Sequence, residues 1–188
     1  MGEVRTVVEL REIFSCLELI PNIGVKALMT FILSSGMDRD FALTLTIKNL
    51  VNACRHELQL TSEDEVNQDS LDKLLEMNPN RIVARWVNET DDKLRINFSS
   101  PESLFYIFLY LKNRMLEGNL DLNDKLFDIP ESTIDDNLRV SEKLTTMGSF
   151  APSPKDGETI SHKFTLKDLQ EFFETQCLNH LPEDNLFY

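Results

Sequence analysis

Apolar side chains recur every three or four residues along most of the chain, which is the spacing of one face of an α-helix. This pattern predicts a helix over about residues 7–17, a second that runs to Ser35 after a break at Pro21-Asn22, and a helical region over roughly 39–58. The same spacing predicts further helices near residues 70–75, 101–111, 131–145 and 165–173. The chain is therefore expected to be mainly α-helical.

Two segments carry apolar residues at every second position instead. Residues 81–88 and 93–98 alternate in this way, and Glu89-Thr90-Asp91-Asp92 between them is a polar stretch suited to a turn. The predicted fold class is accordingly α+β, mainly α with a small antiparallel β-hairpin or sheet. Trp86, in the first strand, is expected to lie in the core and not to stack on a nucleic-acid base.

Several residues fit the positions at which helices begin and end. Gly36 follows the second helix, where a left-handed C-terminal cap favours glycine. Ser70 is expected to cap the next short helix, and Ser100-Pro101 to begin the long apolar one, because proline is favoured at the first helical position. The polar stretches 61–69 and 148–161 are expected to be loops.

Composition restricts the class of protein. The chain has 188 residues, 41% hydrophobic and 27% charged, which fits one globular domain over residues 1–188. Its 19 basic and 32 acidic residues give a formal net charge of −13, which disfavours strong DNA binding because that affinity comes largely from Lys and Arg at phosphates. Three widely spaced cysteines predict reduced thiols in a cytoplasmic protein. No membrane partner is expected, because no apolar run reaches the roughly 20 residues of a spanning helix.

Three short motifs stand out within this arrangement of elements. They are Ser-Ser-Gly-Met at 34–37, Ser-Pro-Glu at 100–102 and the apolar skeleton of Phe-Thr-Leu-Lys-Asp-Leu-Gln-Glu-Phe-Phe at 164–173. Together they resemble the catalytic domain of tyrosine recombinases, the phage-type integrases, especially those of archaeal elements. The resemblance spans roughly residues 7–180. It implies a tyrosine-recombinase catalytic-domain-like fold without the separate N-terminal core-binding domain that clamps DNA in intact integrases.

The resemblance also assigns catalytic positions, most of which hold other residue types here. The family's first arginine follows the Gly-Met pair, whereas this chain has Asp38 there and Arg39 one residue later. One residue turns a helix by about 100°, so Arg39 would point elsewhere unless the turn differs. The family's lysine, the general acid for the leaving 5′-hydroxyl, lies near the hairpin turn. This chain has Glu89 in that region, and Lys93 is the nearest amine.

The end of the chain carries the remaining family positions. The histidine position holds Lys167 and the second arginine position holds Gln170, and glutamine cannot replace a bidentate guanidinium at a phosphate. The family's nucleophilic tyrosine would correspond to Tyr188, the last residue. The candidate catalytic remnants are therefore Arg39, Lys93, Lys167 and Tyr188, while Asp38, Glu89 and Gln170 occupy family positions.

The resemblance implies phosphoryl transfer from DNA to tyrosine, in which preorganised cations usually supply the largest catalytic term. Because most of those cations are replaced, we expect an integrase-like protein of DNA integration and recombination that has lost strand cleavage. Its partners would be DNA, bound weakly, or another recombinase protomer. The alternative is an acidic interaction module that binds a basic protein or regulates an active recombinase. A third possibility is an active recombinase that uses Arg39, Lys93 and Lys167.

No cofactor and no metal is expected. Cys54, His56, Cys177 and His180 formally make a zinc set, but the first spacing is short and both cysteines fit apolar helix faces. His162 could stand in for the family histidine, but a solvated loop residue is the simpler interpretation. The sequence has no Gly-rich phosphate loop and no nucleotide fingerprint.

Overall fold

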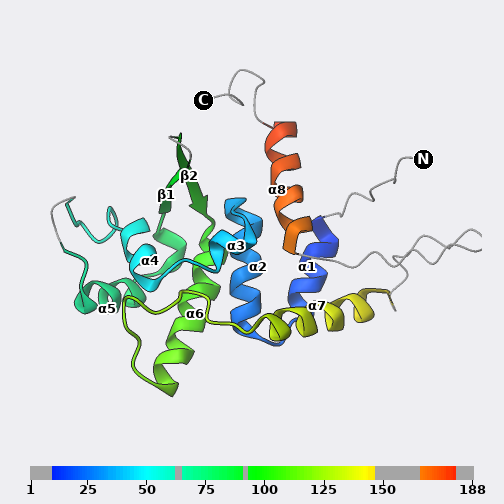
Figure 1. Ribbon diagram of the computed structural model, residues 1–188, viewed down its shortest axis with the longest axis horizontal. Coiled ribbons are helices and arrows are strands. Elements are labelled where there is room, and N and C mark those ends of the chain that lie inside the picture. The colour runs from blue at the N-terminus through cyan, green and yellow to red at the C-terminus, as the bar shows by residue number, and fades with distance from the viewer. Residues whose placement is uncertain (1–9, 62–64, 91–92, 147–165, 181–188) are drawn as a thin grey trace, which may run out of the picture.

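The computed structural model describes residues 10–61, 65–90, 93–146 and 166–180. These parts of the chain form eight α-helices, one 3-10 helix and a two-stranded antiparallel sheet, which confirms the mainly helical architecture with a small hairpin (Figure 1). None of the described helices is long and apolar enough to cross a membrane. The elements are α1 (Leu10–Leu19), α2 (Ile23–Ser35), α3 (Arg39–Ala42), α4 (Ile47–Ala53), α5 (Gln68–Glu76), η1 (Pro79–Arg81), β1 (Ala84–Thr90), β2 (Lys93–Ser99), α6 (Pro101–Glu117), α7 (Glu131–Thr146) and α8 (Leu166–His180).

Helix α2 is the centre of the core. Most of its side chains are buried, since its sequence is apolar on nearly every face. Asn22 caps its start by accepting a hydrogen bond from the Val25 N–H at 3.0 Å. Gly36 caps its end with a φ of 65° and donates its N–H to the Ile32 carbonyl at 2.9 Å, so the predicted left-handed cap is confirmed. Helices α6 and α8 and strand β2 all pack against α2.

Phe31 of α2 joins the hairpin to the helical core. Its buried ring lies 5.0 Å from the ring of Trp86 in a T-shaped pair and 5.4 Å from the ring of Phe127. Trp86 also donates its indole N–H to Ser99 Oγ at 2.6 Å, which satisfies its polar group inside the hairpin. Trp86 is 3% exposed and therefore belongs to the core, as predicted.

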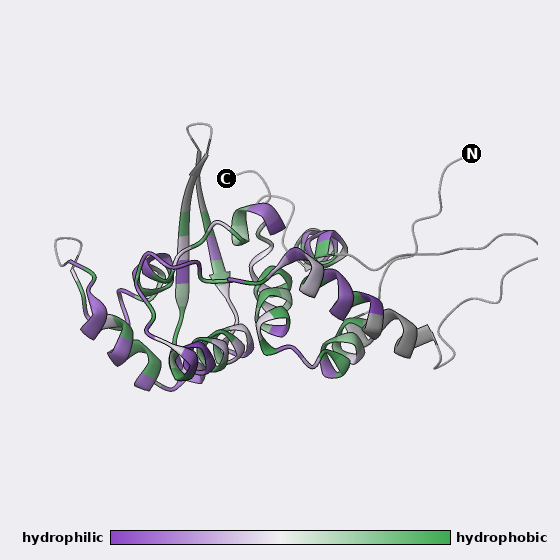
Figure 2. Cartoon of the chain, turned by 60° about the horizontal axis from the view of Figure 1, so that its bottom comes forward, coloured by the Kyte–Doolittle hydropathy of each residue, from purple (hydrophilic) through white to green (hydrophobic). Residues whose placement is uncertain are grey.

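The hairpin projects from the layer of helices (Figures 1 and 2). Strand β1 begins at Ala84, later than predicted, because residues 79–81 form η1, whose start is capped by the Asn78 side chain. The strand continues to Thr90, so Glu89 and Thr90 belong to the ladder and not to the predicted turn.

The helical region predicted over residues 39–58 is divided in two. Helix α3 ends at Ala42 and α4 begins at Ile47. The interruption has a local cause, because Thr46 and Asn49 form a capping box at the start of α4. The side chain of each residue accepts a hydrogen bond from the backbone N–H of the other. The capping residue has extended backbone angles, so a single helix cannot continue through it.

Helix α5 starts earlier than predicted. Asn67, and not Ser70, is its capping residue, and the Asn67 side chain accepts the Ser70 N–H at 3.1 Å. Ser70 completes this capping box from within the helix. The apolar face predicted for the helix, formed by Leu71, Leu74 and Leu75, is buried.

Residues 118–130 show no helix or strand pattern in the sequence, yet they form part of the core. The Leu126 N–H donates to the Leu45 carbonyl at 2.8 Å, which ties this returning segment to the stretch between α3 and α4. Leu126 and Phe127 are both buried. Backbone hydrogen bonds to distant residues hold this segment in position. Such long-range bonds leave no local pattern in the sequence.

Replacing Gly36 by alanine is expected to lower the free energy of unfolding by about 2 kcal/mol or more. A left-handed backbone costs a residue with a Cβ roughly 1–2 kcal/mol. The new Cβ would also lie 2.2 Å from Cδ1 of Phe173, so the α8 ring would have to move. Urea unfolding followed by circular dichroism measures the loss.

Gly118→Ala is the matched control. No atom lies within 4 Å of a Cβ at Gly118, so alanine there should be neutral or stabilise by up to about 1 kcal/mol through the unfolded chain. Similar losses at Gly36 and Gly118 would contradict the assigned cause.

Ser99→Ala is expected to destabilise the protein by roughly 1–3 kcal/mol, because it leaves the buried indole N–H of Trp86 without its acceptor. Trp86 is the sole tryptophan, so its fluorescence follows unfolding of this region. Ser132→Ala, at an exposed position of α7, is the control. A difference between the two variants below about 0.5 kcal/mol would show that the indole finds another acceptor.

Candidate functional site

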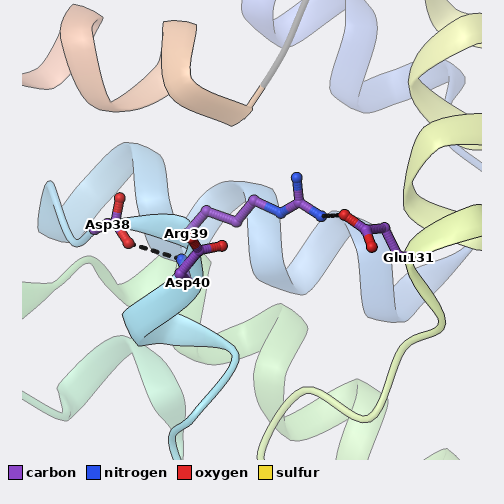
Figure 3. Close-up of polar contacts among 4 residues, drawn as sticks. All are labelled: Asp38, Arg39, Asp40 and Glu131. Atoms are coloured by element: carbon purple, nitrogen blue, oxygen red, sulfur yellow. Dashed lines mark hydrogen bonds and ion pairs between the residues drawn. The ribbon is translucent and has the colours of Figure 1, made fainter.

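Asp38 has a structural role at the start of α3. Its Oδ1 accepts a hydrogen bond from the backbone N–H of Asp40 at 2.8 Å (Figure 3). It accepts a second from the backbone N–H of Phe41 at 3.2 Å. This is the bonding of a helix N-cap, for which aspartate is among the preferred residues. The position that the resemblance assigns to an arginine therefore holds a carboxylate that satisfies the first donors of the helix.

Arg39 extends away from Asp38 toward α7 (Figure 3). Its Nη2 donates to Oε1 of Glu131 at 2.5 Å, and this ion pair joins α3 to the first residue of α7. The arginine side chain is 31% exposed, and its Nε is buried without a hydrogen-bond partner among the described residues. A phosphate could use this guanidinium fully only by displacing Glu131.

Helix α8 carries Lys167 and Gln170 and packs against α2, with its Phe173 ring directly over Gly36. Lys167 Nζ lies 3.6 Å from Oε1 of Glu171, an i,i+4 pair on the solvent side of the helix. Gln170 Nε2 donates to Oε1 of Glu174 at 3.1 Å. Both polar side chains are thus engaged with carboxylates of their own helix.

For the other predicted site residues, the structure gives a strand position or no description. Lys93 is the first residue of β2 and pairs with Thr90, while Glu89 lies in β1. Tyr188 and His162 lie outside the described residues. Of the candidate remnants, the structure thus gives Arg39 and Lys167 defined partners, and the two partners come from different helices.

A cavity of about 280 Å³ lies between α3, α4 and β1. Its wall is apolar at Phe41 and Trp86, and its polar side chains include Asn52, Arg55 and Arg85. Among the described residues, no acidic side chain lines it. This site was not predicted from the sequence, because Arg55 and Arg85 are far apart in the chain. They line the same cavity only because α4 packs against β1.

The two arginines of the cavity differ in their bonding. Arg55 is half-buried and donates to Asn52 Oδ1 at 2.8 Å and to the Thr61 carbonyl. Arg85 is exposed on β1, and its side chain makes no hydrogen bond or ion pair within the described parts of the chain. Arg85 is therefore the cation at this cavity that remains open to a ligand.

Cys54 lies at the C-terminal end of α4 and is fully buried. Burial raises the pKa of its thiol from 9.0 to about 12, and the nearby charge of Glu57 adds to the increase. Cys177 is partly exposed on α8. Within the described ranges, no group of three or more His, Cys, Asp or Glu side chains could hold a metal ion.

Comparisons with protein-family models, with curated proteins and with solved structures found no match for this chain.

The Cys54 thiol predicts a loss of stability at alkaline pH. Its folded pKa is raised above the unfolded value of 9.0, so its stabilising contribution is complete below about pH 9 and is lost as pH rises toward about 12. Between about pH 8 and pH 10 this thiol should account for a loss of about 1 kcal/mol. Urea unfolding at the two pH values measures it.

Other groups titrate in the same range, so the comparison is made between variants. Cys54→Ala should remove this part of the pH dependence, whatever it does to stability at neutral pH. Cys177→Ala should leave the dependence as it is in the parent chain. Identical pH profiles for all three proteins would show that Cys54 does not cause the loss.

Proposed function

We propose that this chain is an integrase-like protein associated with DNA integration and recombination that does not cleave DNA. The sequence motifs around Gly36-Met37, Ser100-Pro101-Glu102 and Leu169 to Phe173 support the family part of the proposal. The order of elements is consistent with it, since an apolar helix capped by glycine is followed by a hairpin, a long core helix and a C-terminal helix.

The loss of cleavage follows from how the predicted cations are bonded. The observation that carries it is the ion pair between Arg39 and Glu131, which neutralises the arginine nearest to the family position. Lys167 is paired with Glu171, and Gln170 carries no charge. Because each lost transition-state donor costs on the order of 10²–10³ in rate, the combined losses would leave no useful strand cleavage.

The acidic residues around α3 add a second obstacle. Asp38 and Asp40 are both exposed beside Arg39. Near a protein surface, where the effective dielectric constant is about 20, a carboxylate and a phosphate 4 Å apart repel by about 4 kcal/mol before screening by salt. A DNA phosphate is therefore disfavoured where the family would hold its scissile group.

A second candidate function is an acidic module that binds a basic protein. The observation in its favour is the run of carboxylates at the start of α7, where Glu131 and Asp136 are exposed and Asp135 is half-buried, on a chain of net charge −13. Such a surface could occupy the DNA-binding face of an active recombinase. The two candidates differ in whether this chain itself contacts DNA.

The test combines a suicide substrate with a DNA mobility shift. We expect no covalent protein–DNA adduct from the unaltered chain. Glu131→Gln should free Arg39 and add about one phosphate contact, which steepens the salt dependence of DNA binding by about one in slope without restoring an adduct. Glu117→Gln, the same charge change at the exposed end of α6, is the control.

The outcomes separate the candidates. Salt-sensitive binding of DNA supports the recombination-associated protein, whereas no binding at low salt favours the acidic module. A covalent adduct that disappears in Tyr188→Phe would overturn the proposal and identify an active recombinase.

A further inference from the structure

Among the described residues, one side of the hairpin is an exposed and largely apolar surface. In the ladder, Val87 lies opposite Ile96 and Arg85 opposite Phe98, so these four side chains share one face, which we call the hairpin face. Val87, Ile96 and Phe98 are 58%, 41% and 53% exposed. The base of the hairpin packs on α2 and α4, and the described parts of its strands carry both apolar and polar residues (Figure 2). Clustered exposed apolar residues next to polar ones are typical of interaction sites.

The cavity between α3, α4 and β1 is continuous with the hairpin face. Arg85 and Val87 belong to both, since they line the cavity and are exposed on the sheet. Phe41 and Leu45 provide further apolar wall of the cavity. A ligand could therefore insert one large apolar group into the cavity and lie with its remainder across the strands.

The charge of this region is opposite to that of the whole protein. The cavity has Arg55 and Arg85 and, among the described residues, no carboxylate, on a chain of net charge −13. Arg55 is held by Asn52, so Arg85 is the cation that a ligand would meet. Negative charge beside an apolar group is thus the complement of this surface.

We propose that the hairpin face and the cavity together dock a peptide segment of a partner protein, in which a large apolar side chain is flanked by aspartate or glutamate. The apolar side chain enters the cavity and the flanking carboxylate binds the Arg85 guanidinium. This interaction goes beyond the proposed function, and it requires neither DNA binding nor DNA cleavage.

A peptide fits these features better than DNA does. Duplex DNA is held by many contacts from Lys and Arg to phosphates, and this site has two arginines, one of them already engaged. Phosphates also offer nothing to the exposed side chains of Val87, Ile96 and Phe98. A peptide supplies carboxylates and apolar groups on one strand, and it is long enough to cover the surface beyond the cavity.

The test uses three synthetic peptides of equal length and the fluorescence of Trp86, the sole tryptophan and a residue of the cavity wall. The first peptide has a central phenylalanine flanked by glutamates. The second has lysines in place of the glutamates, and the third has serine in place of phenylalanine. The first should give a saturable change in the full chain, with an affinity roughly tenfold or more above that of the others.

A charge reversal makes the test specific. Arg85→Glu should weaken binding of the acidic peptide by roughly tenfold and strengthen binding of the lysine peptide. Arg81→Glu makes the same charge change at an exposed position of η1 that does not line the cavity, and it should leave both affinities within about twofold. Circular dichroism of each variant shows that the fold is retained.

Several results would overturn the proposal. These are no saturable binding up to about 1 mM peptide, equal effects of Arg81→Glu and Arg85→Glu, or displacement of the peptide by duplex DNA at equal concentration. Self-association that is lost in Arg85→Glu and blocks the peptide would make a second copy of the chain the occupant, and so would also overturn it. Because no arm measures cleavage, failure here leaves the proposed function standing.

Discussion

The packing of Phe31 between Trp86 and Phe127 holds together three parts of the chain that are distant in sequence. A two-stranded hairpin is at best marginally stable in water by itself, so β1 and β2 depend on this contact with α2. Each aromatic pair contributes roughly 0.5–1.5 kcal/mol beyond the area it buries. Strand β1 also packs directly against α4, and the cavity lies between them.

The carboxylates around α3 have structural roles at the starts of helices. Asp38 accepts the first backbone donors of the helix, and Glu131 begins α7, where negative charge is favourable at a helix start. Their carboxylates therefore stabilise the fold directly. The same carboxylates disfavour binding of a phosphate, because the Arg39 guanidinium cannot pair fully with Glu131 and with a phosphate at once.

Local chemistry made much of the fold predictable. The cap at Gly36, the start of α6 at Ser100-Pro101 and the burial of Trp86 depend on neighbouring residues and on alternation, and all three are confirmed. The break in the helix before Thr46 also has a local cause, the capping box. It was not predicted, because the apolar spacing typical of a helix continues across it. The return of residues 118–130 and the pairing of Arg39 with Glu131 depend on contacts between distant segments, which a single sequence does not specify. The candidate remnants were placed by resemblance, and their bonding partners could not be foreseen for the same reason.

Helix α3 separates two surfaces of opposite character. Phe41 faces the apolar, cationic cavity, whereas Arg39 reaches to the acidic start of α7. Apolar burial would supply most of the affinity at the cavity, and the single cation Arg85 would act mainly on specificity and on the rate of encounter. On a chain of net charge −13, a basic partner attracted to the acidic side would not compete for the cavity side. Two partners could therefore bind at once, one on each side of α3.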